Sequence, residues 1–188
     1  MTRVKRLVVG VTGSSAPQLA ITFLREAREL PAVEVHLVVS RGAEKSIALE
    51  TGLERAAVEA LADYVYQPED MAAAISSGSF PVDGMVVIPC SMNTLATVAA
   101  GISENLISRA ADVTLKERRR LVLVTRETPL SLIHIRNMET VTLAGATVLP
   151  PVPAFYHKPE TIDDLLRHTA GKVFDQFGIQ HSTFKRWA

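Results

Sequence analysis

The stretch Leu121-Val-Leu-Val-Thr-Arg126-Glu127 decides the fold of this 188-residue chain. Its apolar run, Leu121–Val124, is typical of a strand that is buried on both faces of a parallel sheet. The charged residues Arg126 and Glu127 follow just past that strand. Ligands of open α/β sheets bind outside the carboxyl ends of the strands, so we expect these two side chains to lie at a binding site.

Two more cations precede the same strand. Arg109 and Lys116 lie on the predicted helix that leads into it. Together with Arg126 and Glu127 they indicate an anionic ligand and a proton-transfer step at the strand end. For the neighbouring run 118–120, which consists of three arginines, we favour a solvated charge cluster.

Strand-like and helix-like segments alternate along the whole chain. We expect strands at 6–11, 34–39, 84–88, 121–125 and 146–149, and helices at 18–29, 43–50, 53–64, 93–100, 106–117, 131–144 and 161–177. Such alternation predicts right-handed crossovers and an α/β fold of the Rossmann or flavodoxin type, a single open parallel sheet with helices on both faces. We expect one domain over residues 1–188, with a tail at 179–188 that packs on a neighbouring subunit.

Composition narrows the class of protein. Lys and Arg together number 20, as do Asp and Glu, and a formal net charge of zero argues against a nucleic-acid binder. No apolar run is long enough for a membrane span. The single cysteine, Cys90, excludes an internal disulfide and predicts a reduced, cytoplasmic setting. A hydrophobic content of 47% with no net charge favours a buried subunit interface.

The first strand is followed by the loop Gly10-Val-Thr-Gly13-Ser14-Ser15. Its glycines and hydroxyls let backbone amides approach a phosphate at a helix N-terminus. The loop matches neither the dinucleotide fingerprint nor the P-loop, so a mononucleotide fits better, and a simple turn is the alternative. Ser40, after the second strand, reaches the same edge of the sheet.

A second loop, Pro89-Cys-Ser91-Met-Asn-Thr94, follows the third predicted strand. Ser91 is a candidate cap for the next helix, and its hydroxyl could also face a phosphate or a flavin edge. Cys90 is more simply a small buried residue than a nucleophile.

Four other residues have open roles at this level. Glu50 ends an apolar helix and is most simply a surface carboxylate, Tyr156 either packs or donates to a phosphate, and Lys172 and Trp187 are at the surface or reach a neighbouring subunit. The histidines show no metal-ligand spacing, so we predict no metal site.

Taken together, these motifs resemble the UbiX/Pad family of flavin prenyltransferases. The resemblance spans nearly the whole chain, and its most specific parts are the block 109–130 and the segment Pro150-Pro-Val-Pro-Ala-Phe-Tyr-His157. It is also carried by Thr12–Ser15, Leu49–Thr51, Ser76–Ser79, Pro89–Thr94 and Asp175–Gly178.

The resemblance implies a homododecamer that binds FMN between subunits. It implies that a dimethylallyl group moves from dimethylallyl monophosphate to N5 and then C6 of reduced FMN. The product, prenylated FMN, would serve a separate UbiD-like decarboxylase. Because the donor is a monophosphate, the reaction would need no Mg²⁺.

The same resemblance assigns roles to residues of this chain. Flavin binding would fall to Gly13, Ser14, Ser15, Ser40, Ser91, Thr94, Arg109 and Arg126. The allylic phosphate would be held by Lys116, Arg126, Tyr156 and Lys172. The catalytic residues would be Glu50, Lys116, Glu127 and Ser15, with the two carboxyl groups handling protons.

Two features depart from the family pattern. The first loop usually reads Gly-Ala-Ser-Gly-Ala, whereas this chain has Gly13-Ser-Ser-Ala16-Pro17, so a flexible glycine is missing beside the flavin. Lys172 stands where the family often has arginine, which keeps the charge but loses the bidentate fork.

Two other readings stay open at this point. One is an FMN-dependent decarboxylase of the cysteine-decarboxylase type, which shares the fold but whose Pro-x-Met-Asn-x-x-Met-Trp motif this chain lacks. The other is a non-catalytic FMN-binding subunit, which the altered first loop allows.

Overall fold

A six-stranded parallel sheet forms the centre of the protein. The computed structural model describes residues 4–187. The strands are β1 (Lys5–Val11), β2 (Val33–Val39), β3 (Tyr64–Tyr66), β4 (Gly84–Cys90), β5 (Arg120–Thr125) and β6 (Thr147–Val148), in the spatial order β3-β2-β1-β4-β5-β6. This is the strand order of Rossmann-like folds, so the predicted fold class is confirmed.

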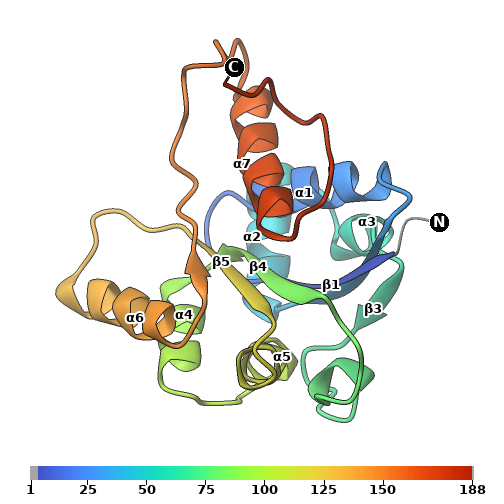
Figure 1. Ribbon diagram of the computed structural model, residues 1–188, viewed down its shortest axis with the longest axis vertical. Coiled ribbons are helices and arrows are strands. Elements are labelled where there is room, and N and C mark those ends of the chain that lie inside the picture. The colour runs from blue at the N-terminus through green and yellow to red at the C-terminus, as the bar shows by residue number, and fades with distance from the viewer. Residues whose placement is uncertain (1–3, 188) are drawn as a thin grey trace.

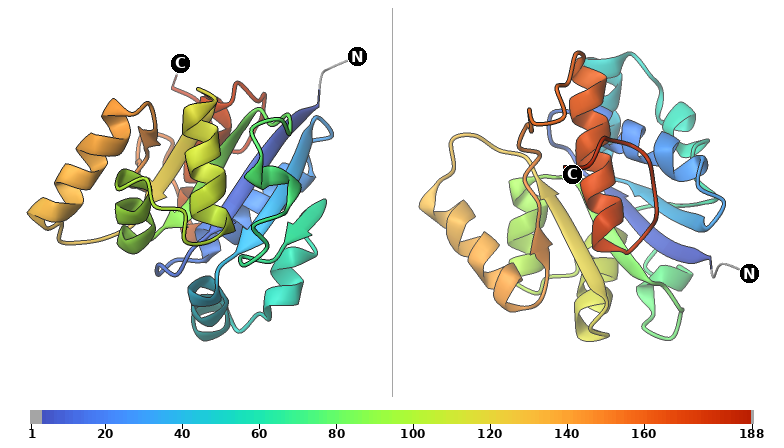
Figure 2. Two further views of the ribbon diagram at one scale, coloured as in Figure 1. Left: turned by 90° about the horizontal axis from the view of Figure 1, so that it is seen from below. Right: turned by 45° about the horizontal axis from the view of Figure 1, so that its top comes forward.

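Helices cover both faces of the sheet (Figures 1 and 2). The core on one face includes residues of α1 (Gln18–Arg28), α2 (Arg41–Thr51), α3 (Arg55–Glu59) and α7 (Ile162–Gln176). The core on the other includes residues of α4 (Met92–Ala99), α5 (Leu106–Lys116), α6 (Leu132–Leu143) and the short 3₁₀ helix η1 (Ala74–Ser76). Because both faces are covered, the central strands are apolar almost throughout, as the unbroken burial of β4 illustrates.

Capping residues mark where several helices begin and end. Ser40 and Ser91 are the N-caps of α2 and α4, and Thr161 forms a capping box with Asp164 at the start of α7. Gly178, just after α7, has φ +63°, a left-handed conformation that favours glycine. Gly178 therefore provides the C-terminal stop of α7 that such a glycine typically gives.

The region 53–64 differs from expectation. The helix there, α3, is only Arg55–Glu59, and the chain continues into an edge strand, β3, that the sequence analysis missed. The rings of Tyr64 and Tyr66 stack on the buried His36 of β2, with centroid distances of 4.6 and 5.8 Å. This cross-strand packing determines the strand, and a local pattern cannot reveal it. The last strand, β6, is also shorter than predicted.

The C-terminal tail folds back along α7 of its own chain (Figure 2). Ile179 is buried, and the Phe184 ring lies against Gly171, where an added Cβ would be 2.5 Å from it. Asp175 accepts hydrogen bonds from Arg186, and its Oδ1 lies 3.1 Å from His181 Nε2. The expected packing of the tail, 179–188, on a neighbouring subunit stays a prediction, and Ala188 lies outside the described residues.

Asp175 is expected to stabilise the tail in a pH-dependent way. Burial raises the pKa of its carboxyl group, but Arg186 and His181 outweigh that effect and hold the pKa at about 2, below its ordinary 3.8. A carboxyl group with a lowered pKa stabilises the fold above its unfolded-state pKa and loses that effect as the pH falls. We expect Asp175→Asn to lower the free energy of unfolding by about 2 kcal/mol at pH 7.

Chemical denaturation from pH 7 downwards measures this effect. The difference between wild type and Asp175→Asn should shrink as the pH falls from about 5 towards 2. Glu29→Gln, an exposed carboxylate at the end of α1, is the control and should change stability by less than about 0.5 kcal/mol at any pH. A constant difference would contradict an electrostatic role for Asp175.

Candidate functional site

A pocket opens where the strand order reverses, between β1 and β4. Loops that leave these two neighbouring strands diverge there, which is where open α/β sheets bind ligands. The pocket has a volume of about 380 Å³. It is lined by Thr12, Gly13, Ser40, Arg41, Gly42, Pro68, Glu69, Ser91, Asn93, Thr94 and Asn105.

The buried hydroxyl of Thr12 ties the two diverging loops together. It donates to the carbonyl of Pro89 at 2.8 Å and accepts from the backbone N–H of Ser91 at 2.8 Å. Ser14 makes a similar bridge to β5, because its hydroxyl donates to the carbonyl of Arg126 at 3.0 Å. The carboxyl ends of β1, β4 and β5 are thus held in one fixed arrangement.

Three helices begin at this pocket. Ser40 Oγ accepts from Ala43 N at the start of α2, and Ser91 Oγ accepts from Thr94 N at the start of α4. Asn105, the N-cap of α5, also lines the pocket. Helix N-termini carry partial positive charge, so three of them around one pocket favour an anionic group such as a phosphate.

The backbone approaches itself closely on one wall of the pocket. A Cβ added to Gly13 would lie 2.9 Å from the carbonyl carbon of Gly42, so any larger residue would push the β1–α1 loop away from α2. Gly13 is therefore required by packing as well as by access of a ligand to the loop.

Glu50 clamps the first loop. Its Oε2 accepts from Ser15 Oγ at 3.0 Å and from Ala16 N at 2.9 Å. The sequence analysis favoured a plain surface carboxylate, and this is wrong in part, because the exposed Glu50 is bonded to the loop. Ala16 has φ +67°, a left-handed conformation that glycine adopts freely and alanine does not. The family glycine that this chain lacks thus falls on a left-handed position.

Arg126 and Glu127 lie at the same edge of the sheet, as predicted. Within the described part of the chain the Arg126 guanidinium has no hydrogen-bond or ion-pair partner, although the residue is half-buried. Glu127 is exposed, and its carboxylate accepts only from the neighbouring Thr128 N, at 3.0 Å. A cation and a carboxylate are therefore available to a ligand beside the pocket.

Lys116 does not join them in one subunit, and the expectation that all four charges surround one strand end is wrong. Lys116 ends α5 next to the start of β5, whereas Arg126 follows the end of β5. Six residues of strand separate the two ends by about 20 Å, more than a lysine side chain spans. Lys116 pairs instead with Glu117, beside Gly78.

The other cations of α5 and its C-terminal loop are also engaged with their own chain. Arg109 Nε donates to the carbonyl of Ser76 at 3.1 Å, and Arg109 pairs with Asp112 at 2.9 Å. Arg119 donates to the carbonyls of Gly78 and Phe80. The run 118–120 is therefore not only a solvated cluster, since Arg119 holds the 76–80 loop.

A third pair of predicted residues lies at α7: Tyr156 is in the loop before this helix, and Lys172 is on it. The Tyr156 hydroxyl lies 3.0 Å from His168 Nε2. Lys172 is exposed and lies 3.5 Å from Asp175 Oδ2. Phe177 follows Lys172 by five residues, and its ring packs against Gly84 at the amino end of β4. Lys172 is thus nearer the amino edge of the sheet than the carboxyl edge where Arg126 lies.

Cys90 is fully buried at the end of β4, and burial raises the pKa of its thiol to about 12. It stays a thiol at neutral pH, which confirms the simpler structural interpretation.

The sequence analysis missed Asn93 and Asn105 as pocket residues and gave Thr12 no role of its own. Thr12 lay inside a quoted motif, but only the fold shows that its hydroxyl bridges two strands.

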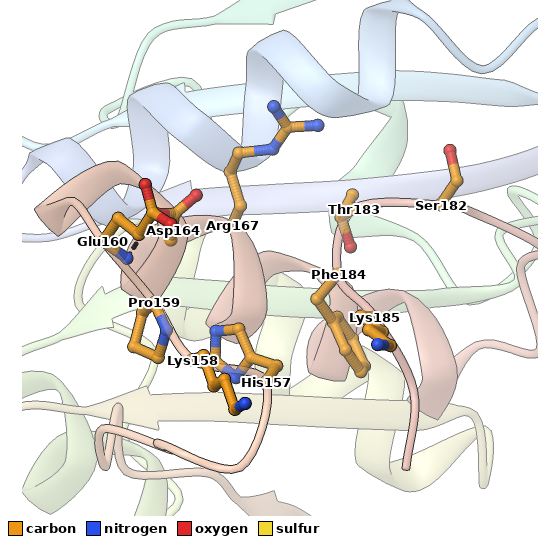
Figure 3. A pocket seen from close by; sticks show the side chains of 10 residues that line it. All are labelled: His157, Lys158, Pro159, Glu160, Asp164, Arg167, Ser182, Thr183, Phe184 and Lys185. Atoms are coloured by element: carbon orange, nitrogen blue, oxygen red, sulfur yellow. Dashed lines mark hydrogen bonds between the residues drawn. The ribbon is translucent and has the colours of Figure 1, made fainter. Parts of the chain in front are cut away.

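A larger pocket, of about 440 Å³, lies away from the β1–β4 switch point, between the tail and the start of α7. Figure 3 shows its side chains, with His157 and Lys158 on one segment and Phe184 and Lys185 on the tail.

In residues 4–187, no group of three or more His, Cys, Asp or Glu side chains could hold a metal ion. Nor does that part of the chain contain a helix long and apolar enough to cross a membrane.

Known proteins share this arrangement along nearly the whole chain. A family model described as Flavoprotein matches residues 1–174. A probable UbiX-like flavin prenyltransferase of Streptomyces sp. (strain D7) is 53% identical over 183 residues, which is 97% of this chain and 92% of that protein. The chain belongs to the flavoprotein family, and within it to the UbiX-like flavin prenyltransferases.

Two solved structures give the same result. AnUbiX (PadA1), crystallised with FMN and dimethylallyl pyrophosphate, superposes with a TM-score of 0.96 at 53% identity, covering 99% of this chain and 98% of the other. A dodecameric FMN-dependent UbiX-like decarboxylase from Escherichia coli O157:H7 has a TM-score of 0.95 at 51% identity, covering 97% and 99%. The peptidyl-cysteine decarboxylase EpiD is only 18% identical, so that likeness concerns the fold alone.

Ala16 offers a test of strain in the first loop. We expect Ala16→Gly to raise the free energy of unfolding by up to about 1 kcal/mol, because relief of about 1–2 kcal/mol of left-handed strain exceeds the entropic cost of a glycine. Thermal or urea unfolding measures the change. Ala57→Gly, in the exposed part of α3, is the matched control and should destabilise by about 1 kcal/mol. Equal losses in both variants would contradict strain at Ala16.

Proposed function

We propose that this protein joins the dimethylallyl group of dimethylallyl monophosphate to N5 and C6 of reduced FMN, producing prenylated FMN. The observation that carries the proposal is the pocket at the β1–β4 switch point. Three helix N-termini meet there, and Arg126 and Glu127 lie at the same edge of the sheet, the Arg126 guanidinium without a partner among residues 4–187. Membership of the UbiX-like family supports it.

The pocket suits the polar part of FMN. Its hydroxyl-bearing residues and the N-termini of α2, α4 and α5 suit a phosphate and a ribityl chain. Ser40, Ser91 and Thr94 are well placed for this role, with Gly13 and Ser14 forming the adjoining loop. When bound, reduced FMN supplies the nucleophilic N5 and C6 positions that receive the prenyl group.

Arg126 and Glu127 would act on the donor. Cleavage of the carbon–oxygen bond leaves an allylic cation and an inorganic phosphate, so a cation beside the phosphate stabilises the departing charge. The guanidinium of Arg126, to which no other described side chain is bonded, suits this task, and a protonated Glu127 can donate a proton to the leaving oxygen. Glu50, which already holds Ser15, is the second carboxylate for the proton released at ring closure.

The remaining predicted residues require more than one subunit. Lys116 lies at the opposite end of β5 from Arg126, and Lys172 lies nearer the amino edge of the sheet, so both can reach the phosphate beside Arg126 only from a neighbouring copy. Tyr156, the other predicted phosphate ligand, lies in the loop after β6. The surface provides apolar contacts for such an assembly: α6 buries only Val141, and its Leu132, Ile133 and Leu143 are 60, 68 and 83% exposed. The dodecameric relative supports a homo-oligomer of this kind.

Two parts of the proposal concern the cell. The product would serve a separate UbiD-like decarboxylase, and the single reduced cysteine favours the cytoplasm.

The function is tested anaerobically. Purified protein is mixed with reduced FMN and either dimethylallyl monophosphate or the pyrophosphate found in the related crystal structure, and the extracted flavin is weighed by mass spectrometry. A flavin heavier by one dimethylallyl unit is expected with the monophosphate. Unmodified FMN with both donors, despite confirmed binding, would contradict the transferase and leave a flavin-binding protein.

Glu127→Gln tests the proton donor. We expect it to reduce prenyl transfer by at least about 100-fold while leaving FMN binding unchanged, because the amide keeps the size of the side chain but cannot supply an acidic proton. Flavin fluorescence measures binding and mass spectrometry measures turnover. Full activity in this variant would remove Glu127 from the mechanism.

Mixed oligomers test the shared site. Lys116→Ala and Glu127→Gln are each expected to be inactive, but coexpressed under two affinity tags they form sites that take a native Glu127 from one subunit and a native Lys116 from another. About one site in four is then native, so activity should return to that level. No recovery in the mixed oligomer would place both residues in one subunit or outside the site.

A further inference from the structure

Tyr156 is anchored by a residue to which no role has been assigned. The residue is 41% exposed, in the loop after β6, and its hydroxyl lies 3.0 Å from Nε2 of His168 on α7. His168 is only 8% exposed. The imidazole is therefore the buried partner of the pair, and Tyr156 is the partner that is accessible from outside.

Neighbouring rings hold His168 in place. The ring of His157 stacks on it in parallel, with a centroid distance of 4.9 Å and an interplanar angle of 7°, and the Phe184 ring lies 4.6 Å away. Figure 3 shows His157 and Phe184 approaching from two different segments, the loop before α7 and the tail. The absence of a side chain at Gly171 lets the tail pack this closely, since a Cβ there would meet Phe184 at 2.5 Å.

The charge state of His168 matters for the hydrogen bond. Burial lowers the pKa of His168, and the nearby His157 and Lys172 lower it further, while Asp175 opposes them. A neutral imidazole has one N–H donor and one acceptor nitrogen. When Nε2 carries the proton, it donates to the tyrosine oxygen, and the phenolic O–H remains available to a second acceptor.

We propose that His168 is a positioning residue for the prenyl donor, holding the Tyr156 hydroxyl so that its proton points at the phosphate. The inference rests on the proposed function, which places Tyr156 at that phosphate. A phosphate offers only acceptor oxygens once deprotonated, so it selects the arrangement in which His168 donates to Tyr156 and Tyr156 donates to the anion. His168 itself does not touch the substrate.

Two substitutions separate the hydrogen bond from the packing. His168→Phe keeps an aromatic ring between His157 and Phe184 but removes the donor, whereas His168→Gln keeps an N–H near the position of Nε2. We expect His168→Phe to raise the KM for dimethylallyl monophosphate about tenfold, the effect of one hydrogen bond to a charged group, with kcat within about twofold. His168→Gln should stay within about threefold of wild type, and FMN affinity should be unchanged in both.

A double-mutant cycle with Tyr156→Phe decides whether His168 acts through Tyr156. In the Tyr156→Phe background, His168→Phe should raise KM no further, because the hydroxyl that it positions is already absent. Thermal unfolding is followed in parallel for every variant. The positioning role would be overturned if the KM increases of the two single variants multiplied in the double variant. It would also be overturned if His168→Gln raised KM as much as His168→Phe does.

The wild-type control distinguishes this proposal from the function on which it rests. Wild type that forms no prenylated FMN would overturn the proposed function and this inference with it. Active wild type with an unchanged KM in Tyr156→Phe would leave the function intact and overturn only the inference.

Discussion

The hydroxyl of Thr12 joins the two strands between which the ligand pocket opens. It donates to the Pro89 carbonyl on the β4 side and accepts from the Ser91 N–H, while its own backbone belongs to the end of β1. The chain leaves β1 and β4 in different directions, and the Thr12 hydroxyl adds to the backbone hydrogen bond from Thr12 N to the Pro89 carbonyl, at 3.3 Å, in holding these loops together. With Ser14 bonded to the Arg126 carbonyl, this bridge extends to the end of β5 and places a cation beside the pocket. The N-terminus of α4 depends on it, because Ser91 is both a bridge partner and the cap of α4.

The rigid sheet that creates the pocket also keeps Lys116 from it. Parallel strands have their carboxyl ends at one edge of the sheet. The helices that lead into these strands end at the opposite, amino edge. Lys116 ends α5 at the amino edge, about 20 Å from Arg126, and no side-chain movement closes that distance. A site that uses both cations therefore has to be built from two copies of the chain. The exposed apolar side chains of α6 fit this requirement, because such a surface is costly in an isolated subunit.

Hydrogen bonds from neighbouring side chains hold two of the predicted site residues, Ser15 and Tyr156, in place. Glu50 bonds to Ser15 and to the strained Ala16, so the β1–α1 loop keeps its conformation without the usual glycine. His168 does the same for Tyr156, supported by His157 and Phe184. In both cases a hydrogen bond within the chain determines how a predicted site residue is held. Such contacts link segments far apart in the chain: the tail, the loop after β6 and α7 all meet at His168.

The sequence by itself determined the elements whose signals are local. The apolar run Leu121–Val124, the caps Ser91 and Thr161 and the stop at Gly178 follow from burial periodicity and hydrogen bonding within a few residues. The order of the strands then placed Gly13, Ser40, Ser91 and Arg126 at one edge. Only the tertiary structure decided the edge strand at Tyr64–Tyr66, the separation of Lys116 from Arg126 and the contact between Tyr156 and His168. Each of these depends on packing or distance between segments that are remote in sequence, which no local pattern encodes.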